Sequence, residues 1–347
     1  MITHGLVFLL SLVVLVKSAD FLVDYAARIA RRLGVSDLVV GLTLTSIGTS
    51  VPELASGLSA SLQGNSGLVI GNVVGSNIAN IGLIAGVAAT IRPFSTDKLM
   101  HDRDGAILLA ASIAFFVLVL DNGFGRVEGI AFLAVYAGYV SFLAQSDREQ
   151  LDSRFRYFLD YVVSLEMVKP LLRRRKGPKP AEDDQTESSD TEAPTGTIFK
   201  DLLVIALAGV GVIVGAKFLV EEATWVARLF GVPDAVIGLS LVAIGTSLPE
   251  LLVAIAAAKK GNASMVIGNV MGSNLANLLL IVGVSSTVRP LEVQEISVVY
   301  TIPIMLFFTL GLLYIVRTGW RITRWQGIIT LLSYLSFMGL AFWRGWS

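Results

Sequence analysis

The sequence predicts an all-α polytopic membrane protein of about ten transmembrane helices, arranged as two inverted-topology repeats of five. Three observations support this fold class. Hydrophobic residues make up 54% of the 347 residues and charged residues only 16%, whereas soluble domains have about 25% charged residues. Apolar stretches long enough to cross about 30 Å of hydrocarbon recur along nearly the whole chain. The second half of the sequence also repeats the first half.

The apolar stretches divide into five before and five after one polar segment. We predict spans at residues 5–27, 37–62, 66–91, 104–121, 126–144, 200–226, 235–258, 263–288, 297–316 and 323–343. Residues 146–198 contain a run of four basic residues from Arg173 to Lys176, four prolines and an acidic stretch. Because this composition cannot bury a core, we expect a solvated linker between a first repeat, 1–145, and a second repeat, 199–347.

The repeats align with a constant offset of 197 residues. Residues 41–93 match residues 238–290 without a gap, and about 30 of the 53 aligned positions are identical. Since each repeat has an odd number of spans, the second enters the membrane upside down, which is a recurrent plan among transporters. Basic residues concentrate in the loops after the odd-numbered spans. This bias predicts a cytoplasmic 146–198 loop, with both termini outside a plasma or inner membrane.

One motif occurs at the middle of the second and the seventh span, as Gly-Thr-Ser-x-Pro-Glu. It places Glu53 and Glu250 near the bilayer midplane, where a carboxylate is costly unless it is paired, protonated or bound to a cation. Pro52 and Pro249 remove a backbone donor, so each helix should break locally. We expect free carbonyl oxygens there, at Ser46, Thr49, Ala243 and Thr246. The alternative interpretation is a proline-kinked helix with a protonated, hydrogen-bonded glutamate.

A second motif, Gly-Asn-Val-x-Gly-Ser-Asn-x-Ala-Asn, occupies residues 71–80 and 268–277. Its glycines are suited to close helix packing. Ser76 and Asn80 are four residues apart and therefore face one side of a helix, as do Ser273 and Asn277. Such side chains either bridge helices by hydrogen bonds or provide oxygen ligands to a hard cation such as Na⁺ or Ca²⁺.

The paired motifs resemble the two alpha repeats of the sodium/calcium exchanger family, of the prokaryotic type, within the calcium/cation antiporter superfamily. This resemblance implies a secondary antiporter that exchanges Na⁺ for Ca²⁺ by alternating access. It also implies that Glu53 and Glu250 are ligands shared by both ions. The remaining implied ligands are Thr49 and Thr246, the carbonyls of Ser46 and Ala243, and the side chains of Ser50, Ser247, Ser76, Ser273, Asn80 and Asn277. The family exchanges about three Na⁺ for one Ca²⁺, so transport would be electrogenic.

One departure from the family pattern concerns Asn277. Prokaryotic relatives and the potassium-dependent branch often carry Asp at this position, so Asn277 predicts K⁺-independent exchange. Two alternatives stay open: an H⁺/Ca²⁺ or other cation antiporter on the same scaffold, and a passive cation channel. We expect a monomer with Ca²⁺, Na⁺ and the lipid bilayer as its partners. No nucleophile or paired general base indicates an enzyme, a cofactor is not expected, and the zero formal net charge gives no indication of nucleic-acid binding.

Overall fold

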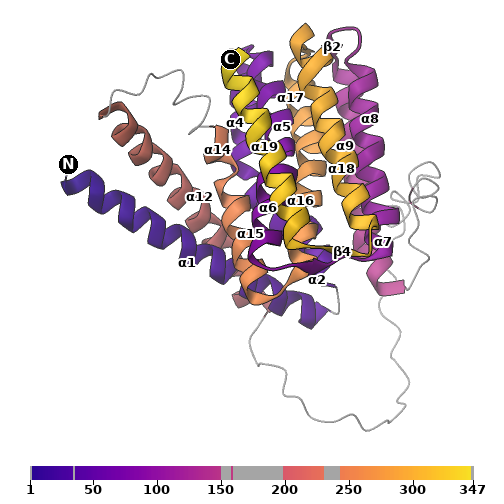
Figure 1. The fold of residues 1–347 in the computed structure, drawn as a ribbon. Helices are drawn as coiled ribbons and strands as arrows, with labels where there is room; N and C mark the ends of the chain where they lie inside the picture. Colours follow the sequence, from indigo (N-terminus) through magenta and orange to yellow (C-terminus); the bar gives the residue numbers. More distant parts are fainter. Residues whose placement is uncertain (1, 34–35, 150–157, 159–197, 230–242, 345–347) are drawn as a thin grey trace.

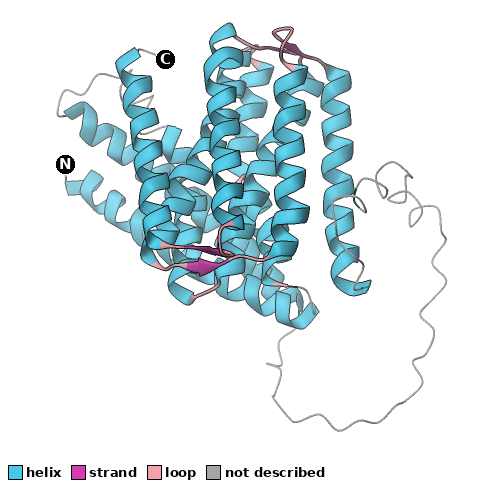
Figure 2. Cartoon of the chain, turned by 45° about the vertical axis from the view of Figure 1, so that its right-hand side comes forward, coloured by secondary structure: helices cyan, strands magenta, loops and turns pink. Residues whose placement is uncertain are grey.

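The computed structural model describes residues 2–33, 36–149, 158, 198–229 and 243–344. Within these ranges the chain is helical except for short turns and four two-residue strands, as Figure 1 and Figure 2 show. Each of the ten predicted spans coincides with helical segments, although residues 235–242 of the seventh span lie outside the described residues. This arrangement confirms the predicted fold class. The 146–198 linker lies almost wholly outside the described residues.

The elements follow the same order in the two repeats. The first repeat contains α1 (Ile2–Leu33), α2 (Asp37–Val40), η1 (Gly41–Thr45), α3 (Ser46–Thr49), α4 (Val51–Leu62), α5 (Ser66–Ala79), η2 (Asn80–Ala85), α6 (Gly86–Ile91), β1 (Phe94–Ser95), α7 (Lys98–Met100), η3 (His101–Gly105), α8 (Ala106–Leu118), β2 (Gly123–Phe124) and α9 (Arg126–Glu149). The second contains α12 (Ile198–Leu229), α14 (Ala243–Thr246), α15 (Leu248–Lys260), α16 (Ala263–Leu275), η6 (Ala276–Ile281), α17 (Val282–Val288), β3 (Leu291–Glu292), η7 (Ser297–Thr301), α18 (Ile302–Arg317), β4 (Arg321–Ile322) and α19 (Arg324–Arg344). The η elements are π-helical turns inside longer helices.

The helices that carry the second motif form the centre of the bundle. Six helices of the described chain are long and apolar enough to cross a membrane on their own, and a bent pair, Leu38–Thr49 and Val51–Leu62, makes a seventh span. Two of the six differ from the rest in burial: 72% of the span window in Ser66–Ile91 and 94% in Ala263–Val288 lie inside the protein, against 28% to 39% elsewhere. Polar groups on these two helices are therefore shielded from lipid.

The two small β-ribbons show that the repeats are inverted. With the offset of 197 residues, β1 coincides with β3, and β2 falls within one residue of β4. Repeats inserted in the same direction would bring equivalent loops to one side. Instead β1 pairs with β4 and β2 pairs with β3, each antiparallel, and the two ribbons lie at opposite ends of the bundle (Figure 1). Loops between the third and fourth spans therefore share a side with loops between the ninth and tenth.

The first and sixth spans, α1 and α12, run antiparallel and lie side by side at an angle to the other helices (Figure 1). The two helices approach closely at Gly211, where an added Cβ would meet the side chain of Ser18, and at Gly215, where it would meet the backbone of Leu15. This is the small-residue spacing that lets membrane helices approach each other. At one end of the pair, the buried Asp201 at the start of α12 forms an ion pair with Arg32 near the end of α1, at 2.7 Å.

Candidate cation site

Both motif glutamates lie directly after a break in their helix. The second span bends by 47° between α3 and α4, at Ser50, because Pro52 has no N–H to donate to the carbonyl four residues earlier. The seventh span has the same arrangement, with Ser247 between α14 and α15. Each break places a glutamate in the first turn of the following helix, where the exposed backbone N–H groups favour a negative charge. Glu53 and Glu250 are both only 2% exposed.

The carbonyl of Ser46 is not free, and that prediction from the sequence is wrong. The Ser50 amide donates to it at 3.0 Å, and the Thr49 hydroxyl also donates to it, at 3.3 Å. The physical reason is the position of the proline: Pro52 removes the donor that would reach Gly48, whereas the donor that reaches Ser46 belongs to Ser50 and is retained. A carbonyl oxygen has two lone pairs, so these contacts leave Ser46 a weaker candidate ligand than the sequence suggested.

Hydrogen bonds join the two motifs across the repeats. The Ser50 hydroxyl, at the break of the second span, donates to Oε1 of Glu250 at 3.0 Å. The Ser247 hydroxyl, at the break of the seventh span, donates to the Ser76 hydroxyl oxygen at 3.4 Å. The site is therefore formed by both repeats together, with the carboxylate of one repeat next to the broken helix of the other.

A second set of cross-repeat bonds connects asparagines of the two central helices. The Asn80 amide nitrogen donates to Oδ1 of Asn274 at 3.0 Å, and the Asn277 amide nitrogen donates to Oδ1 of Asn77 at 3.0 Å. With the offset of 197 residues these are one bond made twice. All four side chains are about 1% exposed or less. The two copies of the motif thus supply two ligand candidates, Asn80 and Asn277. They also supply their hydrogen-bond partners, Asn274 and Asn77, which the predicted ligand set omits.

Most of the predicted ligands are buried in this region. The residues with exposure of 5% or less are Ser46, Thr49, Ser50, Glu53, Ser76, Asn80, Ser247, Glu250, Ser273 and Asn277. Thr246 is partly buried, and Ala243 begins α14. Asn77 and Asn274 are the residues that the predicted set missed. Their position in both copies of the second motif was the available signal, but the motif alone does not tell which amide binds which.

Close packing explains two glycines of the second motif. A Cβ at Gly268 would lie 3.2 Å from the Cα of Gly41, and one at Gly272 would lie 2.6 Å from the carbonyl oxygen of Leu42. The α16 backbone is thus in direct contact with η1, which precedes the break of the second span. A Cβ added at Gly71 or Gly75 would meet no atom of another described helix within 4 Å. The packing role predicted for the glycines is therefore observed at Gly268 and Gly272.

The donor set suits a hard cation. Buried side-chain oxygens without a hydrogen-bond partner among the described residues include Oε2 of Glu53 and of Glu250, Oδ1 of Asn80 and of Asn277, and Oγ of Ser273. Each belongs to the predicted ligand set. Carboxylate, amide and hydroxyl oxygens are the ligands of Na⁺ and Ca²⁺. Within the described ranges, the chain has no group of three or more His, Cys, Asp or Glu side chains that could hold a metal ion, so neutral oxygens must complete any coordination shell.

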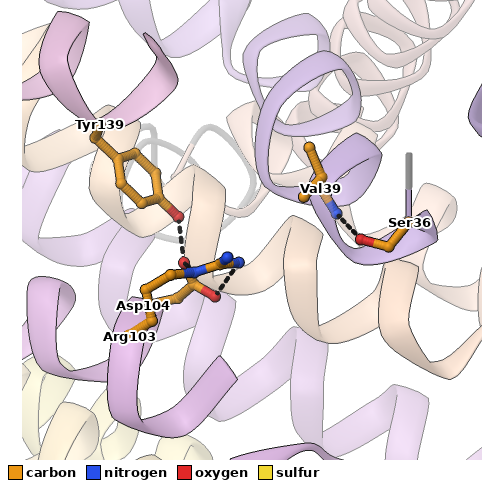
Figure 3. Close-up of polar contacts among 5 residues, drawn as sticks. All are labelled: Ser36, Val39, Arg103, Asp104 and Tyr139. Carbon is orange, nitrogen blue, oxygen red and sulfur yellow. Dashed lines mark hydrogen bonds and ion pairs between the residues drawn. The ribbon is translucent and has the colours of Figure 1, made fainter. Parts of the chain in front are cut away.

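Another buried carboxylate, Asp104, differs from the two glutamates because both of its oxygens have hydrogen-bond partners within the protein. Arg103 donates to both of its oxygens, at 3.0 Å each, and the Tyr139 hydroxyl donates to Oδ1 at 3.0 Å (Figure 3). Phe158, within the 146–198 segment, contacts the Tyr139 ring. Because Asp104 has a neutralising cation from the protein itself, it requires no ion from solution. Glu53 and Glu250 have no such partner in the part of the chain that the structure describes.

Known proteins resemble this chain in both sequence and fold. The family described as "Sodium/calcium exchanger protein" matches residues 3–145 and 200–343. Sodium/calcium exchanger MaX1 of Methanosarcina acetivorans is 43% identical over 343 residues, which is 97% of this chain and 98% of that protein. The uncharacterized membrane protein MJ0091 of Methanocaldococcus jannaschii is 33% identical over 329 residues, 94% of each chain.

A solved structure has the same fold. The sodium-calcium exchanger NCX_Mj, soaked with 2.5 mM Na⁺ and 0.1 mM Ca²⁺, superposes with a TM-score of 0.74 at 31% identity, and the match covers 98% of both chains. The agreement thus covers both repeats and the fold. The chain belongs to the sodium/calcium exchanger family of membrane antiporters.

Proposed function

We propose that this protein exchanges Na⁺ for Ca²⁺ at one site between the two repeats, by alternating access, electrogenically and without K⁺. The observation that carries the proposal is the pair of buried glutamates, each with an unpartnered carboxylate oxygen among the described residues. Glu250 also accepts a hydrogen bond from Ser50, at the helix break of the other repeat. Two carboxylates balance one Ca²⁺, or two of several Na⁺ ions. The two substrates therefore compete for the same oxygens, which couples the movement of one to the movement of the other.

The proposed moving part is the α1–α12 pair. It lies at an angle to the bundle, and α1 also contacts α15, the helix that carries Glu250. Small residues at its crossing permit close backbone contact. Sliding of this pair along the broken helices would open the site to one side of the membrane at a time, as in other carriers built from inverted repeats.

The first expected result is Ca²⁺ uptake that needs Na⁺ alone. Proteoliposomes loaded with Na⁺ should take up radiolabelled Ca²⁺ against its gradient, and replacing K⁺ by choline on both sides should leave the rate unchanged within error. An inside-negative potential should slow this uptake if Ca²⁺ enters against about three Na⁺, because one net positive charge then leaves in each cycle.

The same preparation separates the alternatives. Uptake driven by a pH gradient without Na⁺ would favour an H⁺/Ca²⁺ antiporter. Passive Ca²⁺ equilibration that never exceeds the external concentration would favour a channel. A strict requirement for K⁺ would contradict the prediction from Asn277 and would place the transport activity with the potassium-dependent exchangers.

The second expected result concerns orientation. We propose that residues 146–198 lie in the cytoplasm and that both termini lie outside. The native chain has no cysteine, so a Ser188→Cys variant carries a unique thiol. An impermeant thiol reagent applied to intact cells should leave Ser188→Cys unlabelled and should label it fully after the cells are opened.

A Gln63→Cys variant is the matched control for accessibility. Gln63 is exposed next to the Gly64 turn, on the side predicted to be outside, and should be labelled in intact cells. Labelling of Ser188→Cys, but not of Gln63→Cys, from outside would reverse the proposed orientation.

A further inference from the structure

The asparagine bonds between the repeats have a direction that bears on ion binding. Asn80 and Asn277 each use the amide nitrogen as a donor, to Asn274 and Asn77 respectively. A side-chain amide has a donor end and an acceptor end. Once the nitrogen is engaged, the oxygen must point the other way. In both repeats that oxygen, Oδ1, is buried and lacks a hydrogen-bond partner among the described residues.

We propose that Asn77 and Asn274 are positioning residues for the cation site: each holds the amide of a ligand asparagine of the other repeat so that its oxygen, not its nitrogen, faces the ion. This inference rests on the proposed function, because it assumes that Asn80 and Asn277 bind cations. The flipped amide would present an NH₂ group to a cation and leave a carbonyl oxygen against the Oδ1 of its partner. Both contacts are repulsive, so the partner asparagine excludes the wrong orientation.

Three features separate this role from simple helix bridging. The bond is made twice with the same polarity, at positions related by the offset of 197 residues. The Oδ1 atoms of Asn77 and Asn274 each accept a hydrogen bond from the ligand asparagine of the other repeat, and neither is among the buried oxygens without a hydrogen-bond partner in the described part of the chain. The ligand asparagines lie at the first turn of the π-helical segments η2 and η6, and such segments are frequent at functional sites because they reorient side chains locally.

The test uses substitutions that remove or retain the acceptor oxygen. Asn77→Leu and Asn274→Leu keep a similar volume but remove it, so the partner amide can rotate. We expect an apparent KM for Ca²⁺ about tenfold higher in each, equivalent to about 1.4 kcal/mol, with a smaller change in the maximal rate. Asn77→Asp retains an acceptor for the Asn277 amide and should recover part of the affinity at low pH, where the added carboxyl is protonated and neutral.

A second measurement distinguishes positioning from bridging. Thermal unfolding of each purified variant in detergent is followed without ions and with Ca²⁺. A ligand stabilises the protein according to its concentration relative to its Kd. If Asn77 and Asn274 are positioning residues, their substitution by Leu should therefore reduce the Ca²⁺-dependent increase in Tm. If these residues only bridge helices, the same substitutions should lower the ion-free Tm and leave the Ca²⁺-dependent increase intact. That second pattern, or a wild-type KM in both Leu variants, would overturn the inference.

Ser61→Ala provides the matched control. The buried Ser61 hydroxyl donates to the carbonyl of Ser285 in the other repeat at 2.7 Å, so it is a cross-repeat bond outside the ligand set. This variant should retain the wild-type Ca²⁺-dependent increase in Tm. Failure of the proposed function itself has a separate signature, since wild-type protein would then show neither Na⁺-driven Ca²⁺ uptake nor stabilisation by Ca²⁺.

Discussion

Replacing either Glu53 or Glu250 by Gln should reduce Na⁺-driven Ca²⁺ uptake at least about 100-fold, which corresponds to a loss of about 2.7 kcal/mol. Glutamine preserves the shape of the side chain and one carbonyl oxygen, so folding should be little affected. It removes the charge, and one carboxylate then faces the two positive charges of Ca²⁺ in a buried site. Electrostatic interactions are stronger at such sites than in water, which makes the loss of one charge severe.

The variants are measured as purified, monodisperse protein in proteoliposomes, with uptake normalised to reconstituted protein. Glu221→Gln is the control for the chemical change, because the Glu221 side chain is 52% exposed on α12 and belongs to neither motif. It should transport at the wild-type rate. The two site variants should also not be additive, since Glu53 and Glu250 act on one ion. Wild-type rates in Glu53→Gln or Glu250→Gln would remove the ligand assignment.

The global arrangement of the chain was predictable because duplication leaves a long signal. An offset of 197 residues aligns whole spans, and an odd span count per repeat then requires inversion. The pairing of β1 with β4 and of β2 with β3 confirms that inference with contacts that no hydropathy pattern contains. Two-residue strands are too short to give a period-two signal, so the sequence could not have indicated them.

The identity of the site was more predictable than its internal contacts. A carboxylate at the middle of an apolar span is informative by itself, and both glutamates are indeed buried at helix breaks. The sequence predicts the break but not which carbonyl the break frees, because Pro52 removes the donor to Gly48, four residues earlier, and not the donor to Ser46. The bond from the Ser50 amide to Ser46 shows that the first turn before the break is intact.

Pairings between side chains of different repeats could not be predicted. The Asn77–Asn277 and Asn80–Asn274 bonds depend on how α5 and α16 cross, which is determined by packing at the bundle centre. Asp104 illustrates the same limit, because its partner Tyr139 lies 35 residues away on another helix. A sequence pattern identifies buried polar residues, whereas tertiary packing decides which of them are satisfied and which stay available to an ion.

The charge at position 277 gives the last expected result. Asn277→Asp keeps an oxygen at the Oδ1 position but adds a third carboxylate beside Glu53 and Glu250. A third buried negative charge must bind an additional cation or take up a proton. At low pH, where the new carboxyl is protonated, the variant should transport Ca²⁺ at a rate close to that of the wild type. As the pH rises, the carboxyl ionises. The rate of Na⁺-driven Ca²⁺ uptake should then change several-fold with pH or with the addition of a monovalent cation such as K⁺.

The measurement is Ca²⁺ uptake by wild-type and Asn277→Asp proteoliposomes at several pH values, with K⁺ or choline as the second cation. Asn80→Asp, the equivalent change in the first repeat, should behave in the same way if the two asparagines play equivalent roles. Asn269→Asp adds a buried carboxyl outside the proposed ligand set, on the same helix as Asn274, and should mainly lower the Tm. If Asn277 only bridges helices, Asn277→Asp will resemble Asn269→Asp: it will be less stable, with unchanged ion selectivity and pH dependence. Altered ion selectivity or pH dependence in Asn277→Asp, absent from Asn269→Asp, would assign Asn277 to the ion path. The neutrality of Asn277 would then explain why two glutamates balance one Ca²⁺ without K⁺.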